Sequence, residues 1–311
     1  MPESDYVWLP RQDILSFEEI SVLVDIFGNL GVDRIRITGG EPLLRKDLPE
    51  LISLLSVKSG VHDLALTTNG ILLAEQSSAL KAAGLHRITV SLDSLRPERF
   101  KELTRFNELE TVKAALQEAS KTWEGRVKID TVVIRGVNDD ELTDLLAYGQ
   151  TLGAEVRFIE YMDVGGATRW SFNDVVTRTE IIERIESRYG TVAPIKENTS
   201  APADRFKLTD GTTFGIISST TAPFCESCDR SRLTADGLWY LCLYAQLGTD
   251  LRGPLRKGTS AEELQRLIAS TWKKRSDRGA ETRLAASQRQ PSVPLAELKK
   301  RPHLEMHTRG G

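Results

Sequence analysis

The stretch RIRITGGEPLLRKDLPELISLLSV, residues 34–57, leads from a strand-like segment through a Gly-Gly turn into a helix-like one. Its first part, RIRIT (34–38), predicts a strand, and KDLPELISLLSV (46–57) has the apolar spacing of a helix. A second strand-like segment, LALTT, follows at 64–68. Strand, helix and strand at this spacing predict a βαβ unit with parallel strands and a right-handed crossover.

The same alternation extends to both sides of this unit. Upstream, residues 16–31 predict a helix that opens on Ser16, has Glu19 three residues later and ends at Gly31. Downstream, the predicted elements are a helix at 75–84, a strand at 87–93, a helix at about 110–123, a strand at 127–134, a helix at 140–152 and a strand at 156–162. Five strands alternating with five helices indicate a parallel barrel or a doubly wound sheet.

The chain changes character after residue 170. The elements expected there are a helix at 178–188, a hairpin over 206–217 with its turn at Asp210-Gly211, a second Asp-Gly turn at 236–237, and a helix at 260–274. A tail rich in proline and charge follows. We therefore divide the chain into two parts, residues 1–170 and 171–311.

Composition excludes several classes of function. The 41 basic residues nearly balance the 44 acidic ones, for a net charge of −3, so nothing marks a protein that coats nucleic acid. No apolar run approaches the roughly 20 residues of a membrane span, and the opening MPESDYVWLPRQD is too polar for an export signal. Because all three cysteines lie in one segment, we expect a cytoplasmic protein whose thiols serve a metal or redox role.

Unusual residues gather where the predicted strands end. They are Gly39-Gly40-Glu41-Pro42, Thr67-Thr68-Asn69-Gly70, Ser91-Leu92-Asp93-Ser94, Gly136-Val137-Asn138-Asp139 and Glu160-Tyr161-Met162. Each group alone has an ordinary interpretation as a turn, a helix entry or a cap. The strand ends of a parallel barrel open on one face, however, and that face carries the active site. We therefore expect these residues to line one rim.

The three cysteines follow the pattern C-x2-C-x13-C at Cys225, Cys228 and Cys242. Structural zinc almost always takes four protein ligands, and the four histidines, at positions 62, 86, 303 and 307, lie far from this segment in sequence. A zinc site that borrows a histidine from the tail remains one alternative. Three thiolates suit a [4Fe–4S] cluster in which one iron has no protein ligand and can accept a donor from a substrate.

Together, RIRITGGEPLLR, LTTNG, VSLDS, the lysine-bearing strand, EYM and the C-x2-C-x13-C pattern resemble the GTP 3′,8-cyclases of molybdenum cofactor biosynthesis. These are radical S-adenosylmethionine (SAM) enzymes, and the resemblance runs from Met1 to the terminal Gly-Gly. It implies an α/β fold, namely an incomplete, TIM-like radical SAM barrel that lacks its first strand. A C-terminal α+β iron–sulfur region is expected to follow this barrel.

The resemblance also implies binding residues, although it assigns no catalytic side chain. The implied residues are Gly40, Ser91 and Met162 for SAM, Arg36, Thr67, Lys128, Arg230 and Arg232 for GTP, and Cys225, Cys228 and Cys242 for a second, substrate-binding [4Fe–4S] cluster. Core packing is the alternative interpretation for Met162. An internal salt bridge is the alternative for the strand residues, and a solvated basic loop is the alternative for the arginine pair.

The reaction implied by the resemblance begins when an electron cleaves SAM at a first cluster. The 5′-deoxyadenosyl radical then takes the ribose 3′ hydrogen of GTP, and the carbon radical attacks C8 of the base. The terminal Gly310-Gly311 is expected to reach into the cavity, and Arg309 stands where the family is expected to have an apolar residue. The implied partners are GTP, SAM and an unidentified electron donor, without nucleic acid or membrane, and a homodimer is compatible with them.

The sequence departs from the family at its start. Family members hold the SAM-cleaving cluster with a C-x3-C-x2-C motif, and a stretch like Met1-Pro2-Glu3 directly follows its last cysteine. We therefore expect the chain as written to lack the ligands of this first cluster, the first strand and an N-terminal arginine, and to perform no radical chemistry alone. A truncated or misplaced start is the expected cause. The alternatives are a degenerate, non-catalytic GTP-binding or iron–sulfur scaffold, another radical SAM enzyme, and a zinc-containing binding module.

Overall fold

The computed structural model describes residues 9–164, 170–197, 199–286 and 289–310. Its main feature is an eight-stranded sheet with the order β1-β2-β3-β4-β5-β8-β7-β6. Neighbours from β1 to β8 in this order pair in parallel, whereas β8–β7 and β7–β6 are antiparallel. The strands are β1 (Arg34–Ile37), β2 (Asp63–Thr68), β3 (Arg87–Ser91), β4 (Val127–Val133), β5 (Glu155–Glu160), β6 (Ala193–Ile195), β7 (Asp204–Lys207) and β8 (Thr213–Ile217). The five strands expected before residue 170 are therefore present and parallel.

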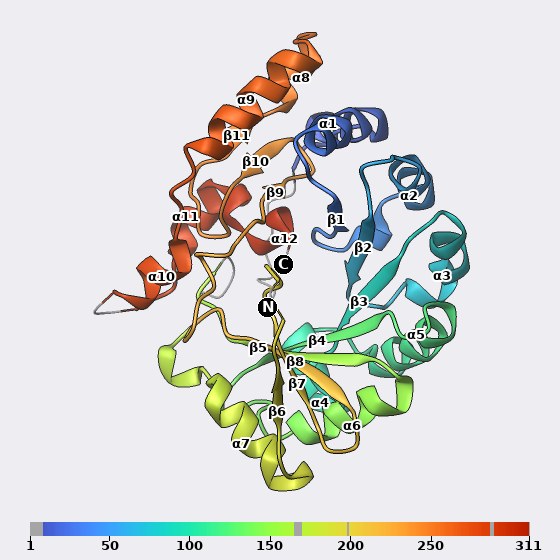
Figure 1. Ribbon diagram of the computed structural model, residues 1–311, viewed down its shortest axis with the longest axis vertical. Helices are drawn as coiled ribbons and strands as arrows, with labels where there is room; N and C mark the ends of the chain where they lie inside the picture. Colours follow the sequence, from blue (N-terminus) through green and yellow to red (C-terminus); the bar gives the residue numbers. More distant parts are fainter. Residues whose placement is uncertain (1–8, 165–169, 198, 287–288, 311) are drawn as a thin grey trace.

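Helices cover the outer side of this curved sheet (Figure 1). They are α1 (Phe17–Asn29), α2 (Leu48–Ser56), α3 (Leu73–Ala82), α4 (Pro97–Thr104), α5 (Leu109–Thr122) and α6 (Leu142–Leu152). The capped helix expected near the start is confirmed, since Ser16 and Glu19 form a reciprocal capping box and Gly31 follows with a φ of 92°. The sequence pattern does not predict α4. Sheet and helices form the partial TIM-like barrel that was expected.

The two faces of the barrel sheet differ in chemistry. The face toward the helices is apolar, and Leu64, Leu66, Ile88, Val90 and Ile129 are fully buried there. Successive residues of a strand point to opposite faces, so the residues between these positions point to the inside of the barrel. That inner face is polar, whereas many TIM barrels pack theirs with apolar side chains. A polar interior is suited to binding charged molecules.

The C-terminal part contains a small sheet of order β11-β10-β9 and further helices. Its elements are α7 (Arg178–Tyr189), β9 (Arg232–Leu233), β10 (Leu238–Tyr240), β11 (Thr249–Asp250), α8 (Arg252–Arg256), α9 (Ala261–Lys273), α10 (Gly279–Leu284), α11 (Leu295–Lys300) and α12 (Met306–Arg309). The predicted hairpin is confirmed, because β7 pairs with β8 around Asp210-Gly211. The second predicted turn, Asp236-Gly237, is also present and joins the paired strands β9 and β10. In the described part of the tail beyond α9, the three short α-helices α10, α11 and α12 were not predicted from composition.

A second apolar core joins the two parts of the chain. Leu23 and Ile26 of α1 pack in one cluster with Trp239 of β10 and with Leu264 and Ile268 of α9. Figure 1 shows the same arrangement at the level of elements, with α9 beside α1 and α12 close to β1. The C-terminal part therefore packs against the β1 side of the barrel.

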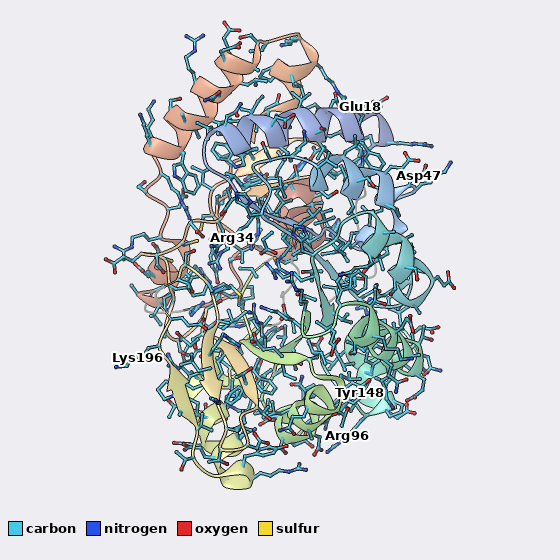
Figure 2. The ribbon with its side chains drawn as sticks, turned by 45° about the vertical axis from the view of Figure 1, so that its right-hand side comes forward. Glu18, Arg34, Asp47, Arg96, Tyr148 and Lys196 are labelled. Atoms are coloured by element: carbon cyan, nitrogen blue, oxygen red, sulfur yellow. The ribbon has the colours of Figure 1, made fainter. Side chains whose placement is uncertain are left out.

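The outer surface carries charged side chains. Glu18 and Asp47 are exposed at the upper right of Figure 2, and Lys196 is exposed at its lower left. Among the helices in the described ranges, none is both long enough and apolar enough to cross a membrane.

Candidate functional site

Neighbouring strands place polar side chains side by side on the inner face of the barrel. Thr67 of β2 is in register with Thr89 of β3, which is in register with Lys128 of β4. Arg36 of β1 reaches toward them, and its Nη1 donates to Thr67 Oγ1 at 2.7 Å and to Thr89 Oγ1 at 3.2 Å. The fold thus brings together three residues that were predicted to contact GTP, namely Arg36, Thr67 and Lys128.

Lys128 differs from Arg36 in having an acidic partner. Its Nζ lies 3.7 Å from Glu155 Oε1, which also accepts from Arg157 Nε at 3.0 Å. Burial, helped by the Arg157 guanidinium, lowers the pKa of Lys128 to about 8. The internal salt bridge considered as an alternative is therefore present for Lys128, whereas hydroxyl groups hold Arg36.

Asp130 adds an acidic group to the same face. It is in register with Ser91 of β3 and with Arg157 of β5. Burial raises the pKa of its carboxyl, although the Arg157 and Arg36 cations oppose that shift. Its Oδ1 is buried and has no hydrogen-bond partner among the described residues. Because an unsatisfied buried acceptor is costly, this part of the inner face is better suited to a polar ligand than to packing alone.

The residues predicted to bind SAM lie at the carboxyl ends of neighbouring strands. Ser91 is the exposed last residue of β3, Met162 lies two residues after β5, and Gly40 lies in the loop after β1. Glu41 ties that loop to β2, because its carboxylate accepts from Thr68 Oγ1 at 2.7 Å. The three residues thus lie on strand ends or on the loops that follow them, as expected, while their contact with SAM stays a prediction.

The cysteine segment begins at the same rim. It follows β8, whose carboxyl end lies beside that of β5 because the two strands are parallel. Glu160, the last residue of β5, is fully buried and accepts from the backbone N–H groups of Thr220 at 3.0 Å and Thr221 at 2.8 Å. This carboxylate fixes the start of the loop that carries Cys225 and Cys228.

Two guanidinium groups contact the thiol of Cys228. Arg230 Nη2 and Arg275 Nη2 each lie 3.5 Å from Cys228 Sγ. Burial works against ionisation of this thiol, but the backbone N–H of Arg230 and the two guanidinium groups outweigh it and lower the pKa of Cys228. The thiolate form of Cys228, which is the form that binds a metal, is therefore favoured.

The three cysteines predicted to bind a cluster are present as thiols, and their role as its ligands stays a prediction. All are free and partly exposed. Among the described residues, no three His, Cys, Asp or Glu side chains converge as a site for one metal ion would require. A [4Fe–4S] cluster would bind each thiolate through a different iron. Gly279 keeps space beside Cys242, because a Cβ there would lie 3.0 Å from Cys242 Sγ and 2.6 Å from Tyr244 Cβ.

The end of the chain lies against both the cysteine segment and the barrel rim. Gly310 O accepts from Arg232 Nε at 3.5 Å, and a Cβ on Gly310 would overlap the methyl group of Thr38. Arg309 anchors this end, because its Nη1 donates to Leu243 O at 2.7 Å. Burial lowers the pKa of Arg232 to about 10, so its side chain remains a cation at neutral pH. Gly310 thus lies near the site as expected, and Gly311 lies outside the described residues.

Asp163 is a buried residue of this region that no sequence pattern indicated. Its carboxylate accepts from Tyr244 Oη at 2.8 Å and pairs with Arg283 at 2.6 Å and Arg289 at 3.0 Å. The partners lie 81 to 126 residues away in sequence, so local spacing cannot reveal them. Its position directly after Met162 is the one hint, because acidic residues at strand ends often belong to sites. Arg275 escaped prediction for the same reason, since it lies 47 residues from Cys228. Glu160, in contrast, belongs to one of the groups expected at the rim.

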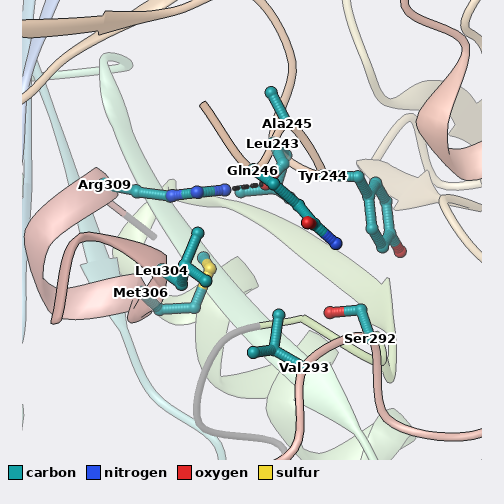
Figure 3. Close-up of a pocket in the computed structure, with 9 residues that line it drawn as sticks. All are labelled: Leu243, Tyr244, Ala245, Gln246, Ser292, Val293, Leu304, Met306 and Arg309. Carbon is teal, nitrogen blue, oxygen red and sulfur yellow. Dashed lines mark hydrogen bonds between the residues drawn. The ribbon is translucent and has the colours of Figure 1, made fainter. Parts of the chain in front are cut away.

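A small pocket, of about 20 Å³, lies between the cysteine segment and the tail (Figure 3). It is lined by Leu243, Tyr244, Ala245, Gln246, Ser292, Val293, Leu304, Met306 and Arg309. None of these residues was predicted to bind GTP, SAM or a cluster. The inner face of the barrel and its rim, and not this pocket, hold the predicted site.

Two family models match this chain. The model described as "Radical SAM superfamily" matches residues 4–149, and the model described as "Molybdenum Cofactor Synthesis C" matches residues 154–281. The first match covers the strands β1–β4, and the second covers β5, β8 and the cysteine segment.

Curated relatives match over nearly the whole chain. "GTP 3',8-cyclase 1" of Mycobacterium tuberculosis is 56% identical over 315 residues, which cover 100% of this chain and 88% of the relative. The "GTP 3',8-cyclase" of Aquifex aeolicus is 43% identical over 91% of this chain and 86% of the relative. A solved radical SAM methyltransferase from Sphaerobacter thermophilus is 18% identical to this chain, with a TM-score of 0.45 over 56% of this chain and 54% of that one.

Proposed function

This chain belongs to the GTP 3′,8-cyclase family of radical SAM proteins, and we propose that it binds GTP at the barrel rim for conversion to (8S)-3′,8-cyclo-7,8-dihydroguanosine 5′-triphosphate. One observation carries the proposal. The parallel pairing of β5 and β8 starts the cysteine segment at the rim, and Arg232 of that segment contacts Gly310, which adjoins Thr38 directly after β1. Cations from the cysteine segment and from the strands are suited to bind the phosphates of a triphosphate.

Two sets of residues divide the recognition of GTP in this proposal. Arg230 and Arg232 come from the cysteine segment, whereas Arg36, Thr67 and Lys128 come from the strands. Arg36 donates to two hydroxyl groups, and although the Asp130 carboxylate attracts the same cation, a phosphate of GTP is the proposed ligand of its guanidinium. Guanidinium groups bind phosphate oxygens in pairs, which fixes orientation as well as affinity. Gly40, Ser91 and Met162 are proposed to line the adjacent SAM site.

The thiols of Cys225, Cys228 and Cys242 would hold the cluster that faces the substrate. When bound, a [4Fe–4S] cluster on three thiolates offers one iron without a protein ligand, to which a donor atom of the purine can coordinate. The sequence contains no further cysteine, so the proposal assigns to this chain no ligand of a SAM-cleaving cluster. The residues described above bind and orient GTP beside this site and hold its phosphates.

We keep the division into a barrel at 1–170 and a C-terminal iron–sulfur region at 171–311 as part of the proposal. The second region also completes the first, because β8, β7 and β6 extend the barrel sheet beyond β5. A cytoplasmic location is proposed from the three free thiols, which suit a reducing compartment. A homodimer is compatible with the proposal.

The proposal is tested by metal analysis and GTP binding of the anaerobically reconstituted chain. We expect about four iron atoms per chain, as one [4Fe–4S] cluster requires. Arg230→Ala should weaken GTP binding about tenfold to a hundredfold in calorimetry, since a hydrogen bond to a charged group contributes about 1.5–3 kcal/mol.

The matched control is Arg266→Ala on α9. Arg266 is exposed and donates to Glu262 O within its own helix, so GTP affinity should not change. Unchanged affinity in Arg230→Ala would remove the arginine pair from the site. Zinc in place of iron would contradict the cluster.

A further inference from the structure

Arg275 contacts both the backbone and the side chain of Cys228. Its Nη1 donates to the carbonyl oxygen of Cys228 at 2.8 Å, and its Nη2 lies 3.5 Å from the sulfur of the same residue. The two nitrogens of a guanidinium have a fixed separation, so this double contact restricts both the backbone and the side chain of Cys228. Arg275 lies 47 residues beyond Cys228, in the segment that follows α9.

Two tryptophans, Trp272 and Trp239, connect Arg275 to the core of the C-terminal part. Its guanidinium lies over the ring of Trp272, 4.7 Å from the centroid, and its backbone N–H donates to Trp272 O at 3.0 Å. Trp272 stacks in turn against Trp239, with ring centroids 6.4 Å apart and an angle of 24°. Trp239 is buried in the core shared by α1 and α9. Arg275 therefore connects Cys228 to that core.

Arg230 contacts the same sulfur in a different way. Its Nη2 also lies 3.5 Å from Cys228 Sγ, but it belongs to the same loop as the cysteine and lies over the neighbouring ring of Phe224 at 4.4 Å. Arg230 thus belongs to the loop that carries Cys228, whereas Arg275 contacts this loop from the segment after α9. Because two guanidinium groups lie at this sulfur, one can hold the cysteine ligand while the other binds the substrate.

We propose that Arg275 is a positioning residue for Cys228. It fixes the orientation of this ligand and donates a charge-assisted hydrogen bond to its sulfur, which leaves Arg230 available to the phosphates of the substrate. The inference rests on the proposed cluster at Cys225, Cys228 and Cys242. Hydrogen bonds and positive charge at ligand sulfurs stabilise the reduced form of an iron–sulfur cluster and raise its reduction potential. Arg275 should therefore set the potential of this cluster.

The test measures the midpoint potential of the reconstituted cluster by an EPR-monitored redox titration, without GTP or SAM. Arg275→Met removes the charge and both hydrogen bonds, and the equilibrium constant for reduction should fall about tenfold, equivalent to about 59 mV for one electron. Arg275→Lys keeps the charge but loses the two parallel N–H donors of the guanidinium. The midpoint potential of its cluster should therefore lie between those of Arg275→Met and the unaltered chain. Lys274→Met removes one charge from the neighbouring exposed residue and should leave the potential unchanged.

Several results would overturn the inference. They are an unchanged potential in Arg275→Met, an equal shift in Lys274→Met, or an unaltered chain that assembles no iron–sulfur cluster. If Arg275→Met does not retain iron, Arg275→Lys decides, and an unchanged potential there rejects the role. GTP affinity, measured on the same samples, separates this inference from the proposed function. Absence of GTP binding counts against the function alone, whereas an unmoved potential counts against Arg275 alone.

Discussion

Lys128 illustrates how one side chain sets a pH dependence at the scale of the residue. Its pKa is lowered to about 8 by burial and by the Arg157 guanidinium, so the cation is present below pH 8 and is lost as the pH rises through that value. The phosphates of GTP remain anionic throughout. GTP affinity should therefore fall about tenfold between pH 7 and pH 9, if bound GTP keeps this lysine protonated. Calorimetry in buffers of different ionisation enthalpy would also detect proton uptake near pH 8.

Lys128→Arg is the matched control for this prediction. A guanidinium stays charged throughout this range, so the affinity of the variant should be nearly constant from pH 7 to pH 9. A variant whose affinity falls as steeply as that of the unaltered chain would show that another group titrates. Lys128 would then be placed outside the GTP site.

Single residues also show what can be predicted from sequence. Arg36 and Lys128 stand out because charged side chains interrupt short apolar strands, and this pattern is visible without a structure. Asp163 and Arg275 have no such local signal. Their roles depend on partners between 47 and 126 residues away, which only the packing of the C-terminal part brings near. Charged residues in loops are common, so their sequence context alone does not distinguish them.

At the scale of elements, the start of α7 combines a capping box with an ion pair. Thr177 N donates to Glu180 Oε2 at 2.9 Å, and Arg135 Nη1 pairs with Glu180 Oε1 at 2.7 Å. Arg135 chiefly, with the hydrogen bonds from Thr177, lowers the pKa of Glu180 to about 2. The stabilisation by this carboxylate is therefore complete above about pH 4.5 and is lost as the pH falls toward 2.

Glu180→Gln isolates the charge of this cap, because glutamine can still accept from the Thr177 backbone. We expect the variant to lose about 1 kcal/mol in the free energy of unfolding at pH 7, since the ion pair is partly exposed. The difference from the unaltered chain should shrink at pH 3. Urea unfolding followed by circular dichroism measures both values. An equal difference at the two pH values would contradict the role assigned to the charge.

The bounds of some elements differ from those that the periodicity of apolar residues predicts. The strand expected at 156–162 ends at Glu160, because the strands on both sides end there too: Val133, its partner, is the last residue of β4, and β8 ends at Ile217. The short helices of the tail also went unpredicted. α12 has four residues, so its stability comes from tertiary contacts such as Arg309 with Leu243 and not from helix propensity.

At the scale of the whole molecule, the two parts of the chain are interlocked. The C-terminal part supplies β8 to the barrel sheet, and α9 shares a core with α1. Asp163 adds a polar connection, because it joins the loop after β5 to Tyr244 and to two arginines of the tail. The boundary near residue 170 therefore separates two parts of the sequence that share one sheet and one apolar core. Local sequence patterns could not reveal these contacts, because they join residues far apart in the chain.

Asp163→Ala tests this connection between the barrel and the tail. The carboxylate is fully buried and the Arg289 side chain is 6% exposed, so removing the acid leaves buried cations without their partner. Such a loss typically costs about 3–5 kcal/mol. Backbone amides at 283–286 and 289–293 should exchange hydrogen faster in mass spectrometry, while those of β2–β4 stay protected.

Asp25→Ala is the control, because it breaks an ion pair between Lys58 and an aspartate that is 57% exposed. This variant should lose at most about 1 kcal/mol in the free energy of unfolding. Unchanged exchange in the tail of Asp163→Ala would show that apolar contacts alone hold the tail on the barrel.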